Sequence, residues 1–170
     1  MLDLFLLRHA KSDWNSHDGD DFTRNISKTG IIRTHLITNL LHQKKIKIKE
    51  ILCSPSLRTR RTLDIIEHKL NLNCEVKFVD NLYHLSHESI FDVVVQNSSK
   101  RSVMVISHEP KLSQAIPDFS NESENKFFIQ SQQKFPTSGL FHLRFDTKRW
   151  YEISKSNSCI INFVKPNDLV

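Results

Sequence analysis

The sequence predicts an α/β fold with three layers, in which helices cover both faces of a mixed, mostly parallel central sheet. Apolar runs typical of buried strands alternate with segments of helical periodicity along the first two thirds of the chain. The last third carries short strand-like segments in succession, which adds antiparallel pairing to the sheet. The 170 residues suffice for one good hydrophobic core, so we expect one domain over residues 1–170.

The first expected strand is Leu2 to Leu7, a nearly continuous apolar run typical of central strands that are covered on both faces. The stretch "DWNSHDGDDFTRN" after it is rich in Asp and Asn, which indicates a surface loop. A helix is expected from Ser27, because apolar residues then recur every three to four positions until Lys44 and Lys45 close the pattern.

Three more strands are expected, and each is followed by a segment with helical features. The strands are Glu50–Ser54, Glu75–Asp80 and Ser102–His108. The helices begin at Pro55, near His87 and after Pro110, and the middle one ends near Asn97. Such alternation of strand and helix is typical of parallel sheets with crossover helices.

The last third differs in character from the rest of the chain. Its expected strands are Leu140–Asp146, Trp150–Ser154 and Cys159–Val164. A turn at Thr147 and Lys148 suits a hairpin between the first two of them. The stretch from Asn121 to Lys134 is rich in Asn, Ser, Glu and Gln, and it is predicted to be a mobile loop.

Composition and charge restrict the class of protein. No stretch approaches the roughly 18 apolar residues of a membrane helix, and the N-terminus lacks the features of a signal peptide, so we expect a cytoplasmic protein without a membrane partner. The three cysteines are widely spaced and indicate neither a disulfide framework nor a zinc site. The excess of Lys and Arg (24) over Asp and Glu (19) favours anionic partners, and charge alone does not choose between nucleic acid and phosphorylated molecules.

Two charged stretches have ordinary interpretations. The run "KKIKIK", from Lys44 to Lys49, lacks interleaved aromatic residues and is interpreted as a solvated helix end and linker, so no nucleic-acid partner is expected. The stretch "HDGDD", from His17 to Asp21, holds potential metal ligands, but a polar loop is the preferred interpretation.

Charged and polar side chains gather where three of the expected strands end. They are Arg8, His9, Lys11 and Ser12 after the first strand, Ser54 and Arg58 after the second, and Ser107 and His108 after the fourth. The carboxyl ends of parallel strands meet at one edge of a sheet, where α/β proteins bind ligands. Guanidinium groups match phosphate oxygens, and a neutral imidazole can attack phosphorus. The pattern predicts a pocket for a phosphoryl group, which Thr137 and Ser138 are also placed to reach.

These blocks resemble the histidine phosphatase superfamily. "LLRHAKSDW" resembles its opening signature, in which a strand ends in Arg-His. "SPSLRTRRT" is similar to the second block, which maps onto Ser54, Pro55, Arg58 and Thr62, and "VMVISHEP" is similar to the third, which maps onto His108. The resemblance covers essentially the whole chain. The short length and the Arg-His-Ala-Lys-Ser form of the first block point to the small branch of SixA-type phosphohistidine phosphatases.

The resemblance implies a phosphoglycerate-mutase-like fold and a covalent mechanism without metal or cofactor. His9 would attack the phosphorus atom, and water would hydrolyse the resulting phosphohistidine. The residues that would hold the phosphoryl oxygens are Arg8, Arg58 and His108, with Lys11 and Ser12 as further donors. A hydrogen bond from the other ring nitrogen of His9 to a backbone carbonyl would select the tautomer, and nearby cations would keep the ring neutral.

The proton donor departs from the superfamily's pattern. Many members carry a carboxylate after the third strand that protonates the leaving group, and the corresponding position here holds Asn81. Asp80 and Glu88 are the candidates to replace it. An alcohol leaving group, whose pKa is close to the ~15.7 of water, needs such a donor, whereas imidazole, at about 6.5, leaves with little help. A weak or absent donor therefore favours phosphohistidine as the substrate.

Three functions remain open at this point. The first is a phosphohistidine phosphatase that acts on a phosphorylated protein, such as a histidine phosphotransfer domain. The second is a superfamily phosphatase for small phosphorylated metabolites, which would depend on Asp80 or Glu88. The third is a phosphate-binding module without catalysis, which is disfavoured because such a module needs no nucleophile.

Overall fold

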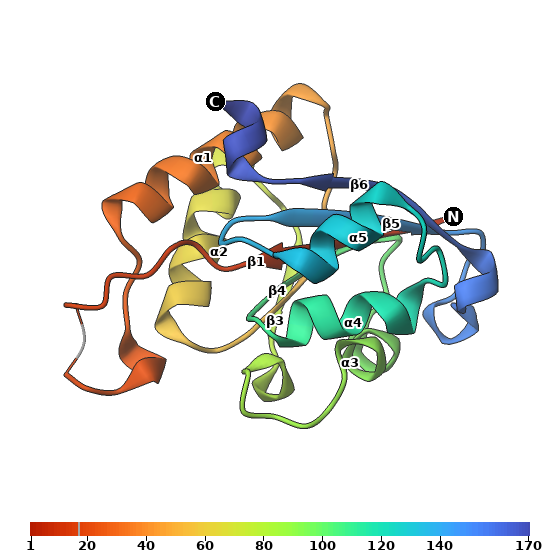
Figure 1. Ribbon diagram of the computed structural model, residues 1–170, viewed down its shortest axis with the longest axis horizontal. Coiled ribbons are helices and arrows are strands. Elements are labelled where there is room, and N and C mark those ends of the chain that lie inside the picture. The colour runs from red at the N-terminus through yellow and green to blue at the C-terminus, as the bar shows by residue number, and fades with distance from the viewer. Residues whose placement is uncertain (17) are drawn as a thin grey trace.

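The computed structural model describes residues 1–16 and 18–170, which contain one six-stranded sheet (Figure 1). The strands are β1 (Leu2–Arg8), β2 (Glu50–Cys53), β3 (Glu75–Phe78), β4 (Ser102–Ser107), β5 (Leu140–Phe145) and β6 (Ser158–Val164). The helices are α1 (Lys28–Gln43), α2 (Leu57–Leu70), α3 (Ile90–Asn97), α4 (Lys111–Phe119) and α5 (Lys126–Gln133). None of the helices in the described ranges is long and apolar enough to cross a bilayer.

The strand order across the sheet is β3-β2-β4-β1-β5-β6. The first four strands of this order are parallel to their neighbours, whereas β5 is antiparallel to β1, and β6 is antiparallel to β5. The predicted mixed, mostly parallel sheet is confirmed. Because Arg8 at the end of β1 lies opposite Ser107 at the end of β4, the residues that follow these two strands emerge side by side.

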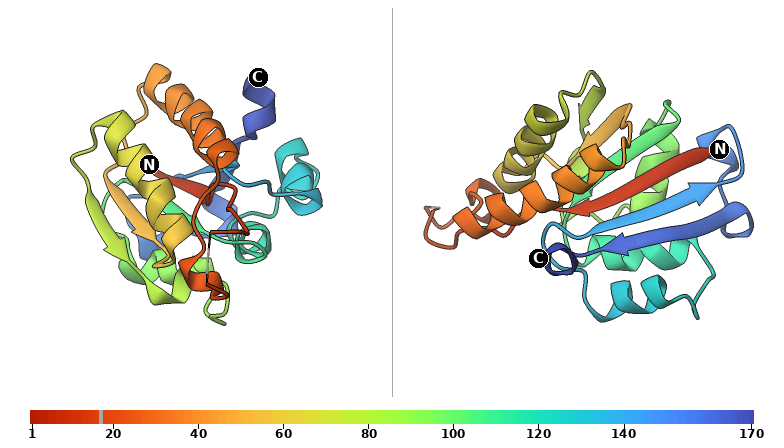
Figure 2. Two further views of the ribbon diagram at one scale, coloured as in Figure 1. Left: turned by 90° about the vertical axis from the view of Figure 1, so that its left-hand side faces the viewer. Right: turned by 90° about the horizontal axis from the view of Figure 1, so that it is seen from above.

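Helices cover both faces of the sheet, as predicted (Figure 2). Helices α1 and α2 pack on one face, and α3, α4 and α5 lie on the other (Figure 1). Successive residues of β4 face opposite cores: Met104 packs with Ile37 and Ile66, whereas Val105 packs with Val94. This double burial explains why the central strands are continuous apolar runs rather than alternating ones.

The first turn of α1 fixes the loop that follows β1. The Ser27 hydroxyl caps the helix by accepting a hydrogen bond from the Gly30 N–H (3.0 Å). The Ser27 N–H and hydroxyl both donate to the Lys11 carbonyl oxygen (2.8 and 3.0 Å). A Cβ atom at position 30 would lie 2.3 Å from that oxygen, so the close approach of helix and loop requires glycine.

The predicted strand at Trp150–Ser154 is wrong. Residues Trp150–Glu152 form a short 3-10 helix, and β5 pairs with β6 instead. The indole N–H of Trp150 donates to the Lys100 carbonyl oxygen (2.7 Å), and the ring packs edge-on against Phe145. A strand is expected here because aromatic residues are frequent in strands, but Trp150 is buried in the core without pairing in the sheet.

The prediction of a mobile loop from Asn121 to Lys134 is also wrong, because its second half is α5. The Asn125 side chain caps this helix by accepting a hydrogen bond from the Phe127 N–H (2.9 Å). Phe127 and Phe128 pack against the core, whereas Gln132 and Gln133 are exposed. The polar composition thus belongs to the outer face of an amphipathic helix.

The boundaries of β3 and α3 differ from the prediction by two to three residues. β3 ends at Phe78, and Asp80–Leu82 form a 3-10 turn instead of the end of the strand. Helix α3 begins at Ile90 rather than near His87, because the Ser89 side chain accepts a hydrogen bond from the Asp92 N–H and caps the helix there.

Candidate active site

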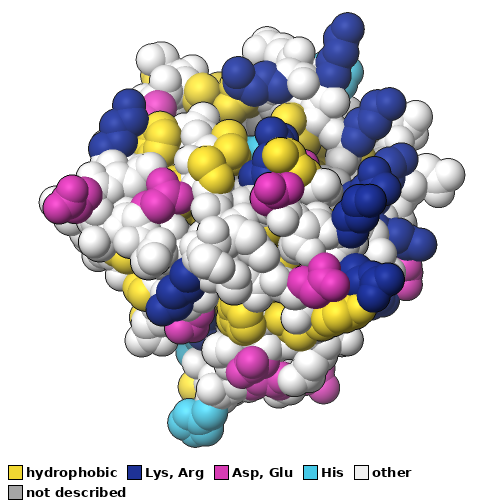
Figure 3. Space-filling view, turned by 90° about the vertical axis from the view of Figure 1, so that its right-hand side faces the viewer, with side chains coloured by type: hydrophobic (Ala, Val, Ile, Leu, Met, Phe, Trp, Pro, Cys, Tyr) yellow, Lys and Arg dark blue, Asp and Glu magenta, His cyan; other side chains and the backbone are white. Residues whose placement is uncertain are grey.

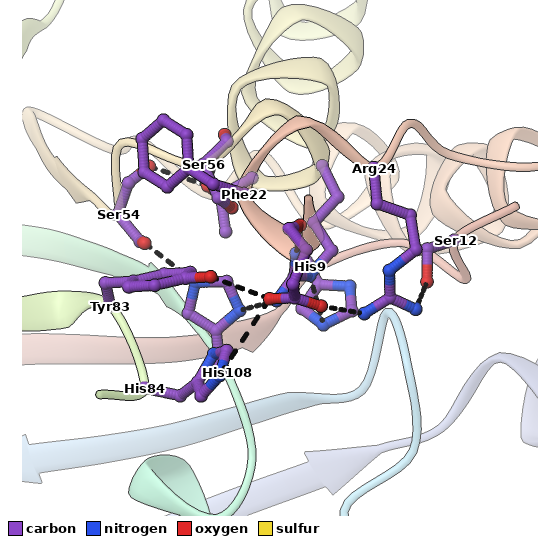
Figure 4. A network of polar contacts seen from close by, with 12 residues as sticks. His9, Ser12, Phe22, Arg24, Ser54, Ser56, Tyr83, His84 and His108 are labelled. Atoms are coloured by element: carbon purple, nitrogen blue, oxygen red, sulfur yellow. Dashed lines mark hydrogen bonds and ion pairs between the residues drawn. The ribbon is translucent and has the colours of Figure 1, made fainter. Parts of the chain in front are cut away.

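Two histidines lie together at the carboxyl ends of the central parallel strands (Figure 4). His9 follows β1, and its backbone N–H donates to the Ser107 carbonyl oxygen at the end of β4 (3.1 Å). His108 follows β4, and the centroids of the two imidazole rings lie 5.2 Å apart. Both side chains are buried. Parallel pairing of β1 with β4 brings these residues together.

The tautomer of His9 follows from its hydrogen bonds. Nδ1 lies 2.7 Å from the Ala10 carbonyl oxygen, which can only accept, so Nδ1 carries the proton. Nε2 then presents a lone pair, which accepts a hydrogen bond from the Arg58 Nε–H (3.3 Å). The predicted hydrogen bond to a backbone carbonyl is confirmed, and Nε2 is the ring atom available as a nucleophile.

The backbone around His9 is held from two sides. On the α2 side, the Ala10 N–H donates to the Thr62 hydroxyl (2.9 Å), so the threonine of the second sequence block supports the first block. On the β5 side, the Ser138 N–H donates to the carbonyl oxygens of Arg8 and His9 (both 3.1 Å). Thr62 and Ser138 therefore fix the backbone on both sides of His9.

Arg58 connects the two histidines. It lies in the first turn of α2 and is 2% exposed. Besides its contact with His9, it donates from Nη2 to Nδ1 of His108 (3.2 Å). Nδ1 of His108 is thus an acceptor, so the proton sits on Nε2, which donates to the Ser54 hydroxyl (2.7 Å).

A polar group that the sequence did not single out completes the site. The Asp21 carboxylate accepts hydrogen bonds from Arg24 (2.7 Å), Arg58 (3.1 Å) and the Tyr83 hydroxyl (2.7 Å). Arg24 also donates to the Ser12 hydroxyl (2.6 Å) and stacks over the Trp14 ring (3.6 Å). In the sequence, Asp21 and Arg24 are part of a polar loop without periodicity. Tyr83 follows the third strand, and that placement is the one signal that could have identified it.

Burial keeps both histidines neutral. It is the main cause that lowers the pKa of His9 to about 3; the hydrogen bond to Ala10 opposes this effect, and the charges of Arg58 and Arg8 add to it. Burial also lowers the pKa of His108 to about 2, with further contributions from His9 and Arg58. Neutral imidazoles among several guanidinium groups make a site for an anion.

Asp21 is ionised and Tyr83 is protonated. Burial alone would raise the pKa of Asp21, but hydrogen bonds from Tyr83 and Arg24 and the charge of Arg58 hold it below its ordinary value. Burial and the hydrogen bond to Asp21 raise the pKa of Tyr83 to about 12. The cluster therefore pairs one negative charge with two guanidinium groups.

Because His9 and His108 are buried and neutral, we expect acid to lower the free energy of unfolding. The unfolded chain binds protons at His9 and His108 near pH 6.5 that the folded chain does not bind, so the free energy of unfolding should fall as the pH falls below about 6.5. Each histidine contributes at most about 1.4 kcal/mol per pH unit. Urea unfolding at several pH values between about 7.5 and 5, above the range of carboxyl titration, measures this slope. The His9→Asn/His108→Asn variant should show a flatter slope, and equal slopes would contradict the assignment.

The histidines and arginines line an open cleft of about 320 Å³, which we call the active-site cleft. Of the residues predicted from the strand ends, it is lined by Arg8, His9, Lys11, Ser12, Arg58 and His108. Thr137 also lines the cleft, whereas Ser138 is buried beneath it. The structure thus brings together the phosphate-binding residues expected from the first, second and fourth strands.

The two carboxylates predicted as proton donors do not line this cleft. Asp80 is exposed in the turn after β3. Glu88 accepts a hydrogen bond from the Asn81 side chain and lines a separate cavity. The carboxylates of the active-site cleft are Asp21 and Glu109.

The potential metal ligands of "HDGDD" fall partly outside the described residues, since His17 is not among them. Asp21 is engaged by arginines, as described above. Within residues 1–16 and 18–170, no three His, Cys, Asp or Glu side chains come together as a metal site.

Known proteins resemble this chain in sequence and in fold. The sequence profile of the histidine phosphatase superfamily (branch 1) matches residues 4–89. Phosphohistidine phosphatase SixA of Escherichia coli (strain K12) is 28% identical over 112 residues, which cover 64% of this chain and 68% of that protein. An uncharacterised protein of Mycobacterium leprae (strain TN) is 26% identical over 165 residues, which cover 94% of this chain and 99% of that protein.

The crystal structure of a SixA protein from Agrobacterium tumefaciens has the same fold, with a TM-score of 0.81 at 24% identity over 97% of this chain and 98% of that one. The expected phosphoglycerate-mutase-like architecture is thereby confirmed. On the profile match, the chain belongs to branch 1 of the histidine phosphatase superfamily, and it is similar to SixA proteins in sequence and in fold.

Proposed function

We propose that this protein removes the phosphoryl group from phosphohistidine in a signalling or phosphotransfer protein, through a covalent phosphohistidine at His9. The observation that carries the proposal is the Nε2 lone pair of His9, which lies in the active-site cleft beside Arg58 and His108. The E. coli relative's name, phosphohistidine phosphatase, agrees with it. The partner is thus a phosphorylated protein.

In the first step, Nε2 of His9 attacks phosphorus in line with the bond to the substrate's imidazole. A new N–P bond forms as the old one breaks, and the electron pair of the old bond stays on the nitrogen of the leaving ring, which departs as neutral imidazole because its other nitrogen carries a proton. Arg8 and Arg58 hold the equatorial oxygens through the transition state, and His108, which accepts from Arg58 at Nδ1 and donates to Ser54 from Nε2, orients Arg58. The N-terminus of α2, where Arg58 lies, adds partial positive charge.

In the second step, a water oxygen attacks the phosphorus of phospho-His9, and the N–P bond breaks. The electron pair returns to Nε2, and inorganic phosphate leaves with the oxygen and one proton of the water, while the other proton goes to solvent. Nδ1 keeps its proton throughout, because the Ala10 carbonyl oxygen holds it. Both steps use only side chains of this chain and water, so the proposed mechanism calls for no metal and no cofactor.

Asp21 competes with the substrate for the guanidinium groups. Its carboxylate accepts hydrogen bonds from Arg24 and Arg58, which are the groups that a phosphoryl oxygen would use. When a phosphoryl group binds, its oxygens therefore replace the Asp21 carboxylate as acceptors for these arginines. Arg24 joins Arg8 and Arg58 as a third guanidinium that lines the cleft.

Among the described residues, the carboxylates of the active-site cleft are both engaged by other groups, and this favours one class of substrate. Asp21 is held ionised by its partners, which lower its pKa, and the two oxygens of Glu109 accept hydrogen bonds from the Ser113 N–H and hydroxyl (both 2.8 Å). Asp80 and Glu88 lie outside the cleft. An imidazole leaves with little protonation, since its pKa is about 6.5, whereas an alkoxide does not. The site therefore suits phosphohistidine better than sugar or alkyl phosphates.

The test compares phosphate release from a phosphohistidine-containing phosphotransfer domain with release from alkyl phosphate monoesters. We expect the monoesters to be slower by about 10² to 10⁴-fold, which is the usual contribution of a general acid. Faster turnover of the monoesters would instead favour a phosphatase for small phosphorylated metabolites. In that case, loss of activity in Asp80→Asn or Glu88→Gln would identify the proton donor.

A further inference from the structure

A second cleft adjoins the active-site cleft and is strongly basic. It measures about 370 Å³, and its charged residues are Arg8, Lys11, Arg33, Lys134, Lys165 and Asp168. We call it the basic cleft. Arg8, Lys11 and Thr137 line both clefts, so the two lie side by side.

Most cations of the basic cleft have no acidic partner. Lys165 lies 3.8 Å from Asp168. Among the described residues, no carboxylate forms an ion pair with the others, which are Arg8, Lys11, Arg33 and Lys134. The unpaired cations of the basic cleft together attract anions. At the opposite end of the molecule, where β1 begins, basic side chains also gather along one edge, but acidic side chains lie beside some of them (Figure 3).

Arg8 sits at the boundary of the two clefts. Its Nη1 donates to the Phe135 carbonyl oxygen (2.8 Å), which fixes the guanidinium next to Lys134 and Pro136. Its Nε is buried and has no hydrogen-bond partner within the described chain. A ligand that reaches from one cleft into the other therefore passes a fixed positive charge.

The lining favours a protein ligand over a nucleic acid. Among the described residues, no aromatic side chain lines the basic cleft, so it offers no platform for stacking bases. Carboxylates, in contrast, bind to guanidinium and ammonium groups, which the basic cleft provides. In the proposed function, the active-site cleft, which lies beside the basic cleft, binds a protein substrate.

We propose that the basic cleft binds a carboxylate-rich segment of the same protein whose phosphohistidine enters the active-site cleft. This inference rests on the proposed function. Because the two clefts lie side by side, one polypeptide can place its phosphoryl group at His9 and its acidic side chains near Arg33 and Lys134. The preferred substrate is therefore an acidic phosphoprotein, which the basic cleft steers and orients.

Binding is tested first without catalysis. A fluorescein-labelled oligoglutamate peptide is titrated with the full chain, and its anisotropy gives the affinity. The charge reversal Arg33→Glu/Lys134→Glu should weaken binding at least about tenfold, because it replaces two attractive charges by repulsive ones. Lys148→Glu/Lys155→Glu reverses two exposed lysines between β5 and β6; it is the matched control and should bind as the wild type does. A thymidine oligonucleotide that binds more tightly than oligoglutamate overturns the proposal.

The second experiment measures kcat/KM for two phosphohistidine peptides, one flanked by glutamates and one by glutamines. We expect the acidic peptide to be preferred at least about tenfold, and the double reversal to abolish this preference while the glutamine peptide keeps its rate. Equal rates for the two peptides in the wild type overturn the inference and leave the proposed function intact. If neither peptide is hydrolysed, the proposed function fails, and the binding experiment alone decides whether the basic cleft holds acidic segments.

Discussion

His9→Ala should abolish phosphate release from phosphohistidine, with a loss of about 10⁴-fold or more in kcat, because the proposed reaction has no other nucleophile. The wild-type protein, quenched during turnover with labelled substrate, should carry phosphate on His9 that is stable to alkali and lost in acid. The variant should carry none. The His9 side chain makes two hydrogen bonds, one to the carbonyl oxygen of the adjacent Ala10 and one from Arg58, and neither joins two elements of the core, so the substitution should leave the fold intact.

His68→Ala is the control for His9→Ala, since His68 is an exposed histidine on α2. It should release phosphate at the wild-type rate and retain the labelled intermediate. Circular dichroism of both variants checks the fold. Residual turnover of His9→Ala above about one per cent would mean that water attacks the substrate directly, and the covalent mechanism would then be wrong.

Arg58→Ala should have the second-largest effect, a loss of about 10² to 10³-fold in kcat, which is typical when a donor to developing negative charge is removed. Arg58 contacts His9, His108 and Asp21 at once, so its removal takes away both a donor and the group that aligns the two imidazoles. Rates measured with a phosphohistidine peptide at saturating concentration separate kcat from binding.

Two variants make the Arg58 result specific. Arg58→Lys keeps the charge but lacks the planar fork, so most of the loss should remain. Arg61→Ala removes an equal charge from the same helix at an exposed ion pair with Asp64, and it should retain wild-type kcat. Full activity of Arg58→Lys would show that charge alone matters and that the fork geometry does not.

The parts of the site that the sequence predicts are those governed by the sheet. Continuous apolar runs identify β1 and β4, and the rule that parallel strands end at one edge places His9 next to His108. Arg58 follows from the same rule, because α2 begins just after β2. These predictions depend on short-range patterns and one topological rule, and the family resemblance adds the roles.

The parts that the sequence does not predict depend on how loops fold back. Asp21 reaches Arg58 and Tyr83 because the loop after β1 crosses the ends of other strands, and no local pattern encodes that path. The sequence predicts a strand at Trp150 and a loop at α5, and the structure differs in both places for a related reason. In both, aromatic side chains find a core that the local sequence does not reveal.

The central place of β1 in the sheet has a consequence for biosynthesis. Its neighbours β4 and β5 come much later in the chain, since Asp3 pairs with Ser102 on one side and with Arg144 on the other. While the ribosome is still making the middle of the protein, β1 has no partner on either side. The two histidines meet only once β4 has emerged. The hydrogen bonds from the Ser138 N–H to the carbonyl oxygens of Arg8 and His9 form later still. Activity therefore arises near the end of translation, and nascent chains that stop before Ser138 should be inactive although every residue of the three sequence blocks is present.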